Sequence, residues 1–199
     1  MSTSKTRNMV VVAMMSAIAV VIYFIEFSLP IMPGFIKLDF SNVMSLIASF
    51  ALGPVEGVLV SLIKNIIHVL IRGFGSTMGI GDFFDFVTSA AFAFTAGFVY
   101  KKKRTFNGAI LGCALGTLVF SVISLPLNYF VTYPVYAKAF GGMDAIIGAY
   151  KALLPNVDNL FAALCIFNFP FTLVKGILCT AVTILIYKPL SPIIKGSSR

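Results

Sequence analysis

Residues 107–130 read NGAILGCALGTLVFSVISLPLNYF, and none of them carries a charge. A helix of about 20 apolar residues crosses the roughly 30 Å hydrocarbon layer of a bilayer. The segment therefore predicts a membrane-spanning helix. Pro126 predicts a kink near its end, because proline interrupts the regular hydrogen bonding of a helix.

The rest of the chain has the same apolar character. Its 199 residues are 59% hydrophobic and 11% charged, and the mean hydropathy is +0.99. Such a composition is far from that of a water-soluble domain, and the length allows about six crossings. We therefore predict an all-α membrane protein whose residues 1–199 form one domain. Its expected architecture is a compact bundle of six transmembrane helices with a loop-capped outer pocket.

Proline, glycine and charge mark the ends of the expected helices. The expected spans are residues 9–29, 42–52, 58–72, 82–100, 107–130 and 160–187. Residues 30–33 close the first span, Ser41 is a candidate N-cap for the second, and residues 53–57 form a tight turn. The longest non-spanning stretch is 132–159, which we expect to hold a short helix, and residues 188–199 form a basic tail.

The net charge of +8 comes mainly from basic residues near span ends, which indicates a membrane surface rather than nucleic acid. With six spans, Lys5, Arg7, residues 101–104 and the basic tail fall on one side. The positive-inside tendency then predicts a cell-membrane protein with both termini cytoplasmic. The loops 30–39, 73–81 and 132–159 would lie outside, where they could cover a pocket.

Ionisable and amide side chains are rare within the predicted spans, and each one indicates a possible function because it is costly to bury in lipid. They are Lys64, Asn65, Asp82, Asp85, Asn128, Asn168, Thr172 and Lys175. Simpler roles stay open for three of them. Lys175 could extend its amine to an interface, Asn128 could join two helices, and Asp82 could cap a helix.

Other site types lack a supporting pattern. His68 is the single histidine and is expected near a loop, and no Cys or carboxylate stands at metal-ligand spacing from it. Cys113, Cys165 and Cys179 are expected to be free, buried thiols. No catalytic motif is recognisable, so we expect neither an enzyme nor a resident cofactor.

Six short motifs follow one another along the chain: PGFIKLDFS at 33–41, LGPVEG at 52–57, IKN at 63–65, GIGDFFDF at 79–86, PLNYF at 126–130 and PFTLVKG at 170–176. In this order they resemble the riboflavin-specific S component of energy-coupling factor (ECF) transporters. The resemblance covers nearly the whole chain. It implies six helices, a vitamin site near the outer face, and uptake of riboflavin as a transported ligand.

The resemblance also implies roles for particular residues. Asn128 and Lys175 match the family's flavin-contacting positions, and residues 37–39 match its first-loop contact region. The turn containing Ala13 and Ala17 would pack against the transmembrane coupling subunit of an ECF module, which carries two ATPases. The expected substrate-binding residues are Asp39, Phe40, Asn65, Asp82, Asn128, Tyr129, Thr172 and Lys175.

The chain departs from the family pattern at three positions. Thr172 stands where we expect asparagine, and Asp82 and Asp85 replace an expected glutamate and asparagine. A hydroxyl offers fewer hydrogen bonds than an amide, so ligand preference could differ in detail. The alternatives are an S component for another vitamin, a self-sufficient secondary carrier, or a structural membrane protein. A carrier of that kind often has two repeated halves, which this sequence does not show.

Overall fold

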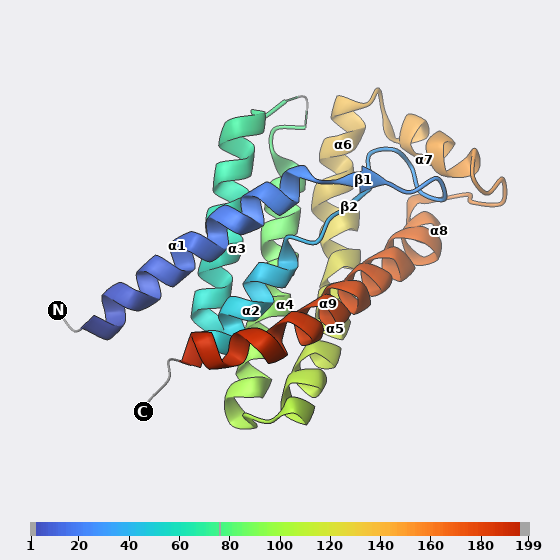
Figure 1. Ribbon diagram of the computed structural model, residues 1–199. Coiled ribbons are helices and arrows are strands. Elements are labelled where there is room, and N and C mark those ends of the chain that lie inside the picture. The colour runs from blue at the N-terminus through green and yellow to red at the C-terminus, as the bar shows by residue number, and fades with distance from the viewer. Residues whose placement is uncertain (1–2, 76, 196–199) are drawn as a thin grey trace.

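The computed structural model describes residues 3–75 and 77–195, and it is almost entirely helical (Figure 1). Short strands and two π-helical turns interrupt the helices. The elements are α1 (Thr3–Phe24), β1 (Phe27–Ser28), β2 (Lys37–Leu38), α2 (Asn42–Ala51), α3 (Pro54–Arg72), α4 (Ile80–Lys102), α5 (Phe106–Leu127), η1 (Asn128–Thr132), α6 (Tyr133–Ala139), α7 (Met143–Lys151), α8 (Leu160–Ala163), η2 (Leu164–Asn168) and α9 (Phe169–Lys195).

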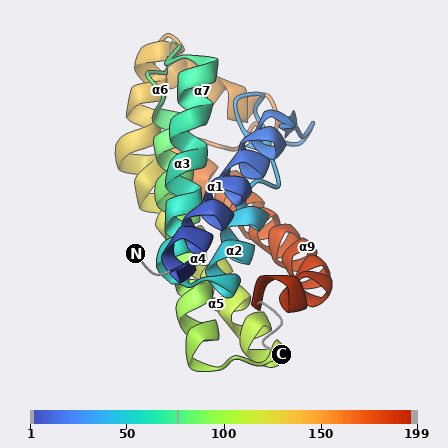
Figure 2. The same ribbon diagram turned by 60° about the vertical axis from the view of Figure 1, so that its left-hand side comes forward.

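Within residues 3–75 and 77–195, five apolar helical segments are long enough to cross a membrane. They are Lys5–Phe24, Pro54–Arg72, Ile80–Lys102, Phe106–Ala139 and Leu160–Tyr187. The sixth helix of the predicted bundle is α2, whose 10 residues span only about 15 Å. It therefore cannot cross a bilayer by itself, but most of its side chains are buried among the longer helices. The predicted all-α bundle is confirmed. Five of its described segments are long enough to cross a membrane, and α2 is a short internal helix that, together with the strand segment before it, returns the chain from the hairpin toward the end where α1 begins (Figure 1 and Figure 2).

Close packing between helices depends on glycine at a few positions. A Cβ atom built on Gly97 of α4 would lie 1.9 Å from the Ser49 hydroxyl oxygen of α2. One built on Gly112 of α5 would lie 2.6 Å from the Ala96 carbonyl oxygen of α4. Side chains at these glycines would push the helices apart. The aromatic and aliphatic core between α2, α4, α5 and α9 depends on this close approach.

The first predicted span was wrong at both ends. Helix α1 begins at Thr3 and ends at Phe24, whereas residues 9–29 were expected. After two intervening residues, Phe27 and Ser28 of β1 pair antiparallel with Leu38 and Lys37 of β2. The backbone groups that would have continued the helix are thus used in a short hairpin. The paired strands and their loop extend from the end of α1 toward α7 (Figure 1).

Helices α3 and α4 both begin earlier than the sequence predicted. Helix α3 begins at Pro54, inside the expected 53–57 turn, because proline suits the first helical turn, where no N–H is required. Helix α4 begins at Ile80, and its N-cap is Gly79 in the left-handed conformation, so Asp82 is not the cap. Ser41 stands at the α2 N-cap position but makes no capping hydrogen bond.

The fifth predicted span was too short. Helix α5 contains Pro126 and continues through the π-helical η1 into α6, so the helical segment reaches Ala139. Thr132, expected to begin a loop, donates its hydroxyl to the Leu127 carbonyl at 3.3 Å. Pro134 lies in the first turn of α6, where it is compatible with a helix. The polar residues after Phe130 predicted a loop, but the backbone hydrogen bonds of η1 and α6 continue the helix through this stretch.

The C-terminal segment is also more helical than expected. Helix α9 continues to Lys195, which includes most of the predicted basic tail, and residues 196–199 of that tail lie outside the described residues. The expected short helix within 132–159 corresponds to α7. Figure 1 shows α7 beside the hairpin and α6, at the end of the bundle where the connection from α3 to α4 also lies.

Candidate binding site

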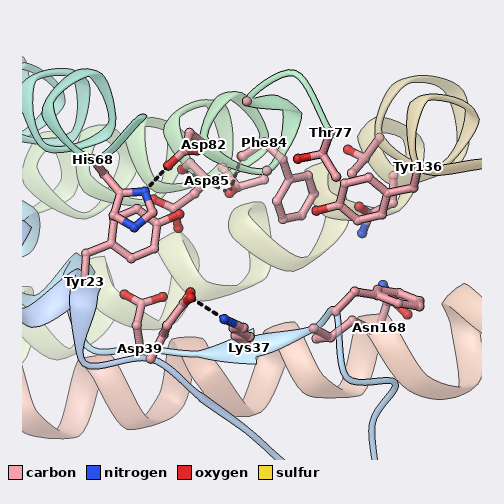
Figure 3. Close-up of a pocket in the computed structure, with 18 of the residues that line it drawn as sticks. Tyr23, Lys37, Asp39, His68, Thr77, Asp82, Phe84, Asp85, Tyr136 and Asn168 are labelled. Carbon is pink, nitrogen blue, oxygen red and sulfur yellow. Dashed lines mark hydrogen bonds and ion pairs between the residues drawn. The ribbon is translucent and has the colours of Figure 1, made fainter. Parts of the chain in front are cut away.

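A cavity of about 690 Å³ lies where the hairpin and the ends of α3, α4, α6 and α9 meet (Figure 3). This volume is in the range of sites for vitamin-sized ligands. Its wall contains charged side chains from several helices together with phenylalanine and tyrosine rings. In Figure 3, His68 and Asp82 lie at one end, and Tyr136 and Asn168 lie at the other.

Two lysines and two aspartates form a charged cluster beside the cavity, consisting of Asp39, Lys64, Asp85 and Lys175. The Lys175 Nζ lies 2.6 Å from Asp39 and 3.6 Å from Asp85, and the Lys64 Nζ lies 2.8 Å from Asp85. All four side chains are buried. Formal charges balance within the cluster, as buried ionised groups require.

Asp39 comes from the segment between β2 and α2. Burial alone raises the pKa of Asp39, but the ammonium groups of Lys175 and Lys64 outweigh burial and hold this pKa well below its ordinary value. Ser41 donates its hydroxyl to the same carboxylate at 2.5 Å. Asp39 therefore stays ionised and links the start of α2 to the second turn of α9.

A second polar group, the hydroxyl cluster, consists of Tyr133, Tyr150 and Asn168. The Tyr150 hydroxyl donates to the Asn168 side-chain oxygen at 2.6 Å, and the Asn168 amide donates to the Tyr133 hydroxyl at 2.7 Å. The two tyrosine hydroxyls also bond each other. Burial raises the pKa of Tyr150, which keeps its hydroxyl protonated. The cluster joins α6, α7 and η2 without any formal charge.

Aromatic rings cover this end of the cavity. Phe35, in the hairpin loop, contacts Tyr133, Tyr136, Phe140 and Tyr150, with ring centroids 5.8 to 6.1 Å apart. These rings provide apolar area and flat faces. A planar aromatic ligand is the type of molecule that such walls accommodate.

The opposite end of the cavity is polar. Glu26 accepts a hydrogen bond from Arg72 at 2.7 Å and pairs with Lys37 of β2. The His68 Nδ1 lies 2.5 Å from Asp82, and the imidazole stacks on Tyr23 with centroids 3.9 Å apart. His68 was expected near a loop; it lies one turn before the end of α3, and its side chain is buried.

The structure brings five of the eight predicted binding residues to the cavity wall. They are Asp39, Asp82, Asn128, Thr172 and Lys175. The other three lie elsewhere. Phe40 packs against the hydrophobic core, Asn65 donates to Asp85 from behind the wall, and Tyr129 is 40% exposed on the outer side of η1.

Several wall residues were not selected from the sequence. Asn168 was noted as a polar residue within a span but was not assigned to the site. The four-residue spacing of Lys64, His68 and Arg72 places them on one helical face, a signal that could have selected His68. No comparable pattern indicated Glu26, whose partners come from distant segments.

Small residues of α1 face away from the cavity. Ala13 and Ala17 are exposed, whereas Val12 and Ser16 are buried against the bundle. Among the described residues there is no group of three or more metal-ligating side chains. All three cysteines are free; Cys113 and Cys179 are buried, and Cys165 is half-buried rather than buried as expected.

Comparison with known proteins agrees with the geometry over nearly the whole chain. The chain is 34% identical to riboflavin transporter RibU of Staphylococcus aureus (strain TCH60), covering 98% of this chain and 96% of that protein. It is 30% identical to riboflavin transporter FmnP of Bacillus subtilis (strain 168), covering 94% of each.

A solved structure described as "Structure and mechanism of the S component of a bacterial ECF transporter" matches with a TM-score of 0.75 and 33% identity. The match covers 96% of this chain and 99% of that chain. The family model for the ECF transporter, substrate-specific component, matches residues 7–187. This chain therefore belongs to the family of substrate-specific components of ECF transporters.

Proposed function

We propose that this membrane protein captures riboflavin in the cavity and delivers it to an ATP-driven ECF module. The observation that carries the proposal is the Asn128 side chain. It lies on the cavity wall at the first residue of η1, and it makes no side-chain hydrogen bond to another described residue. A buried amide without a protein partner is suited to a polar ligand edge. The similar proteins named riboflavin transporters support the choice of ligand.

The polar residues near Asn128 complement a flavin ring edge, which has two carbonyl acceptors around one N–H donor. Lys175 has three N–H donors and directs them partly to Asp39 and Asp85, so a further donor is available for a carbonyl oxygen. Thr172 donates its hydroxyl to the Asn168 carbonyl at 2.8 Å. Its oxygen is then an acceptor for the ring N–H.

The arrangement of the chain ends supports an orientation for delivery. Figures 1 and 2 show the start of α1, the end of α9 and the connection from α4 to α5 toward one end, while α7 lies toward the other. With the basic residues 101–104 at the first end, we infer that both termini are cytoplasmic and that the cavity opens outward. Family membership does not favour a self-sufficient carrier.

The exposed Ala13 and Ala17 provide a face for the coupling subunit, because small side chains allow another helix to approach closely. Tryptophan at either position should leave riboflavin binding intact and abolish uptake by cells that contain the ECF module. Tryptophan at Val122, which is exposed on α5 and so lies away from this face of α1, is the matched control. Equal loss of binding and uptake would contradict this assignment of the face.

The ligand assignment is tested by purifying the protein from cells grown with riboflavin. We expect yellow protein that releases a fluorescent flavin on denaturation, in a ratio near one per chain. A colourless preparation that also fails to bind added riboflavin would reject the proposal.

A further inference from the structure

Four carboxylates line the cavity, and they differ in the groups that neutralise them. Glu26, Asp39 and Asp85 each form ion pairs with Lys or Arg side chains. The fourth, Asp82, has no such partner among the described residues and contacts His68 instead. Asp82 is therefore the cavity carboxylate whose negative charge is least occupied by the protein.

The position of Asp82 leaves one of its oxygens available. It lies in the first turn of α4, where its Oδ1 accepts from the His68 Nδ1 at 2.5 Å, since a carboxylate oxygen only accepts. Its Oδ2 makes no hydrogen bond to another described residue, and the side chain is 15% exposed. Figure 3 shows the two side chains directed toward each other at one end of the cavity.

His68 contacts this carboxylate through Nδ1, while its other ring nitrogen has no hydrogen-bond partner among the described residues. His68 is 2% exposed, so this second nitrogen, Nε2, is buried. The other buried side-chain atoms in that condition belong to Asn42, Ser45 and Asn65, none of which lines the cavity. Because the one hydrogen bond of the imidazole goes to Asp82, His68 acts through Asp82.

The free carboxylate oxygen of Asp82 is better suited to the ribityl chain of a flavin than to the edge of its ring. On the ring edge the N–H stands between two carbonyl oxygens, whose lone pairs repel a carboxylate. A polyhydroxyl chain offers O–H donors without fixed neighbouring acceptors, and hydrogen bonds to a charged acceptor are strong. The aromatic end of the cavity suits the ring, and the Asp82 end suits the chain.

We propose that Asp82 binds hydroxyl groups of the ribityl chain and that His68 is its positioning residue. The ligand then lies with its ring toward Asn128 and its chain toward the start of α4. This inference rests on the proposed function, because it specifies the orientation of riboflavin in the same cavity.

The test compares riboflavin with lumiflavin, which has a methyl group in place of the ribityl chain. Wild-type protein should bind riboflavin about tenfold or more tightly than lumiflavin. His68→Leu should remove most of this preference by weakening riboflavin alone. His68→Asn should restore much of it, because the asparagine amide nitrogen lies near the position of the imidazole Nδ1. Tyr100→Phe, which alters a buried hydroxyl pair outside the cavity, is the control.

The possible results distinguish failure of the Asp82 and His68 assignment from failure of riboflavin binding itself. Equal weakening of both ligands by His68→Leu, or an unchanged preference, would overturn the role of His68 and Asp82 while leaving riboflavin binding established. A wild-type protein that binds neither flavin would reject the proposed function itself. If His68→Leu does not fold, Asp82→Ala replaces it, and an unchanged preference in that variant would equally overturn the inference.

Discussion

The charged cluster and the hydroxyl cluster flank the same cavity, but they satisfy their buried polar groups by different means. Asp39, Asp85 and the two lysines balance formal charges, whereas Tyr133, Tyr150 and Asn168 close a neutral set of hydrogen bonds. Removing one residue of the charged cluster leaves an uncompensated buried charge, whereas removing one hydroxyl of the hydroxyl cluster leaves a single unpaired dipole. The loss in the free energy of unfolding should therefore be severalfold larger for the charged cluster.

The largest effect is expected for Lys175→Met. Methionine keeps the apolar stem but leaves Asp39 buried without its closest cation, which lies 2.6 Å away in the wild type. Breaking a buried ion pair in this way costs about 3 to 5 kcal/mol. Thermal unfolding in detergent without ligand should show a correspondingly large decrease in the free energy of unfolding.

The double variant Asp39→Asn/Lys175→Met is the matched control, because it removes both charges. It should recover most of the lost stability, although riboflavin binding should remain weak since the Lys175 donor is still absent. A single variant as stable as wild type would show that Asp39 does not depend on Lys175.

An intermediate effect is expected for Tyr150→Phe in the hydroxyl cluster. The change deprives the Asn168 side-chain oxygen of its donor, but no charge is exposed. The free energy of unfolding should fall by about 1 to 2 kcal/mol. Tyr187→Phe, which disrupts a buried hydroxyl pair with Tyr100 away from the cavity, provides the comparison in the same unfolding assay. A loss as large as that of Lys175→Met would remove the distinction between the clusters.

The smallest effect concerns pH. Because the folded pKa of Asp39 is lowered, its contribution to stability is present above the unfolded pKa and is lost only as pH falls through the folded value. The stability difference between wild type and Asp39→Asn should therefore stay constant from about pH 8 to 5. Chemical unfolding at several pH values measures it, and a difference that shrinks steadily across this range would contradict the ion-pair account.

The sequence predicted the helical bundle well, because each long apolar run has few other stable arrangements in a membrane. It did not reveal the pairing of Lys175 with Asp39, which are 136 residues apart. A single sequence indicates that a charge needs a partner, but it does not identify which distant residue supplies one. For the same reason the pairing of Phe27 with Leu38 was missed.

Asn128 and Tyr129 are neighbours in one motif, and they show that a motif alone does not identify which of its residues reach the cavity. Both were selected from the same PLNYF stretch, yet Asn128 lines the cavity and Tyr129 lies on the outer side. Successive residues of a helix point in directions about 100° apart, so a motif alone does not assign both to one face. The π-helical turn that begins at Asn128 also changes the local register, which periodicity in the sequence did not predict.

The most direct test of the central claim uses this pair of neighbours. Riboflavin is titrated into purified wild-type protein, Asn128→Leu and Tyr129→Leu, and binding is followed by quenching of flavin fluorescence. We expect saturable binding to wild type, about tenfold or greater loss of affinity in Asn128→Leu, and a change of less than about twofold in Tyr129→Leu. Absence of binding to wild type, or equal affinities in the two variants, would contradict the account that this cavity binds riboflavin through Asn128.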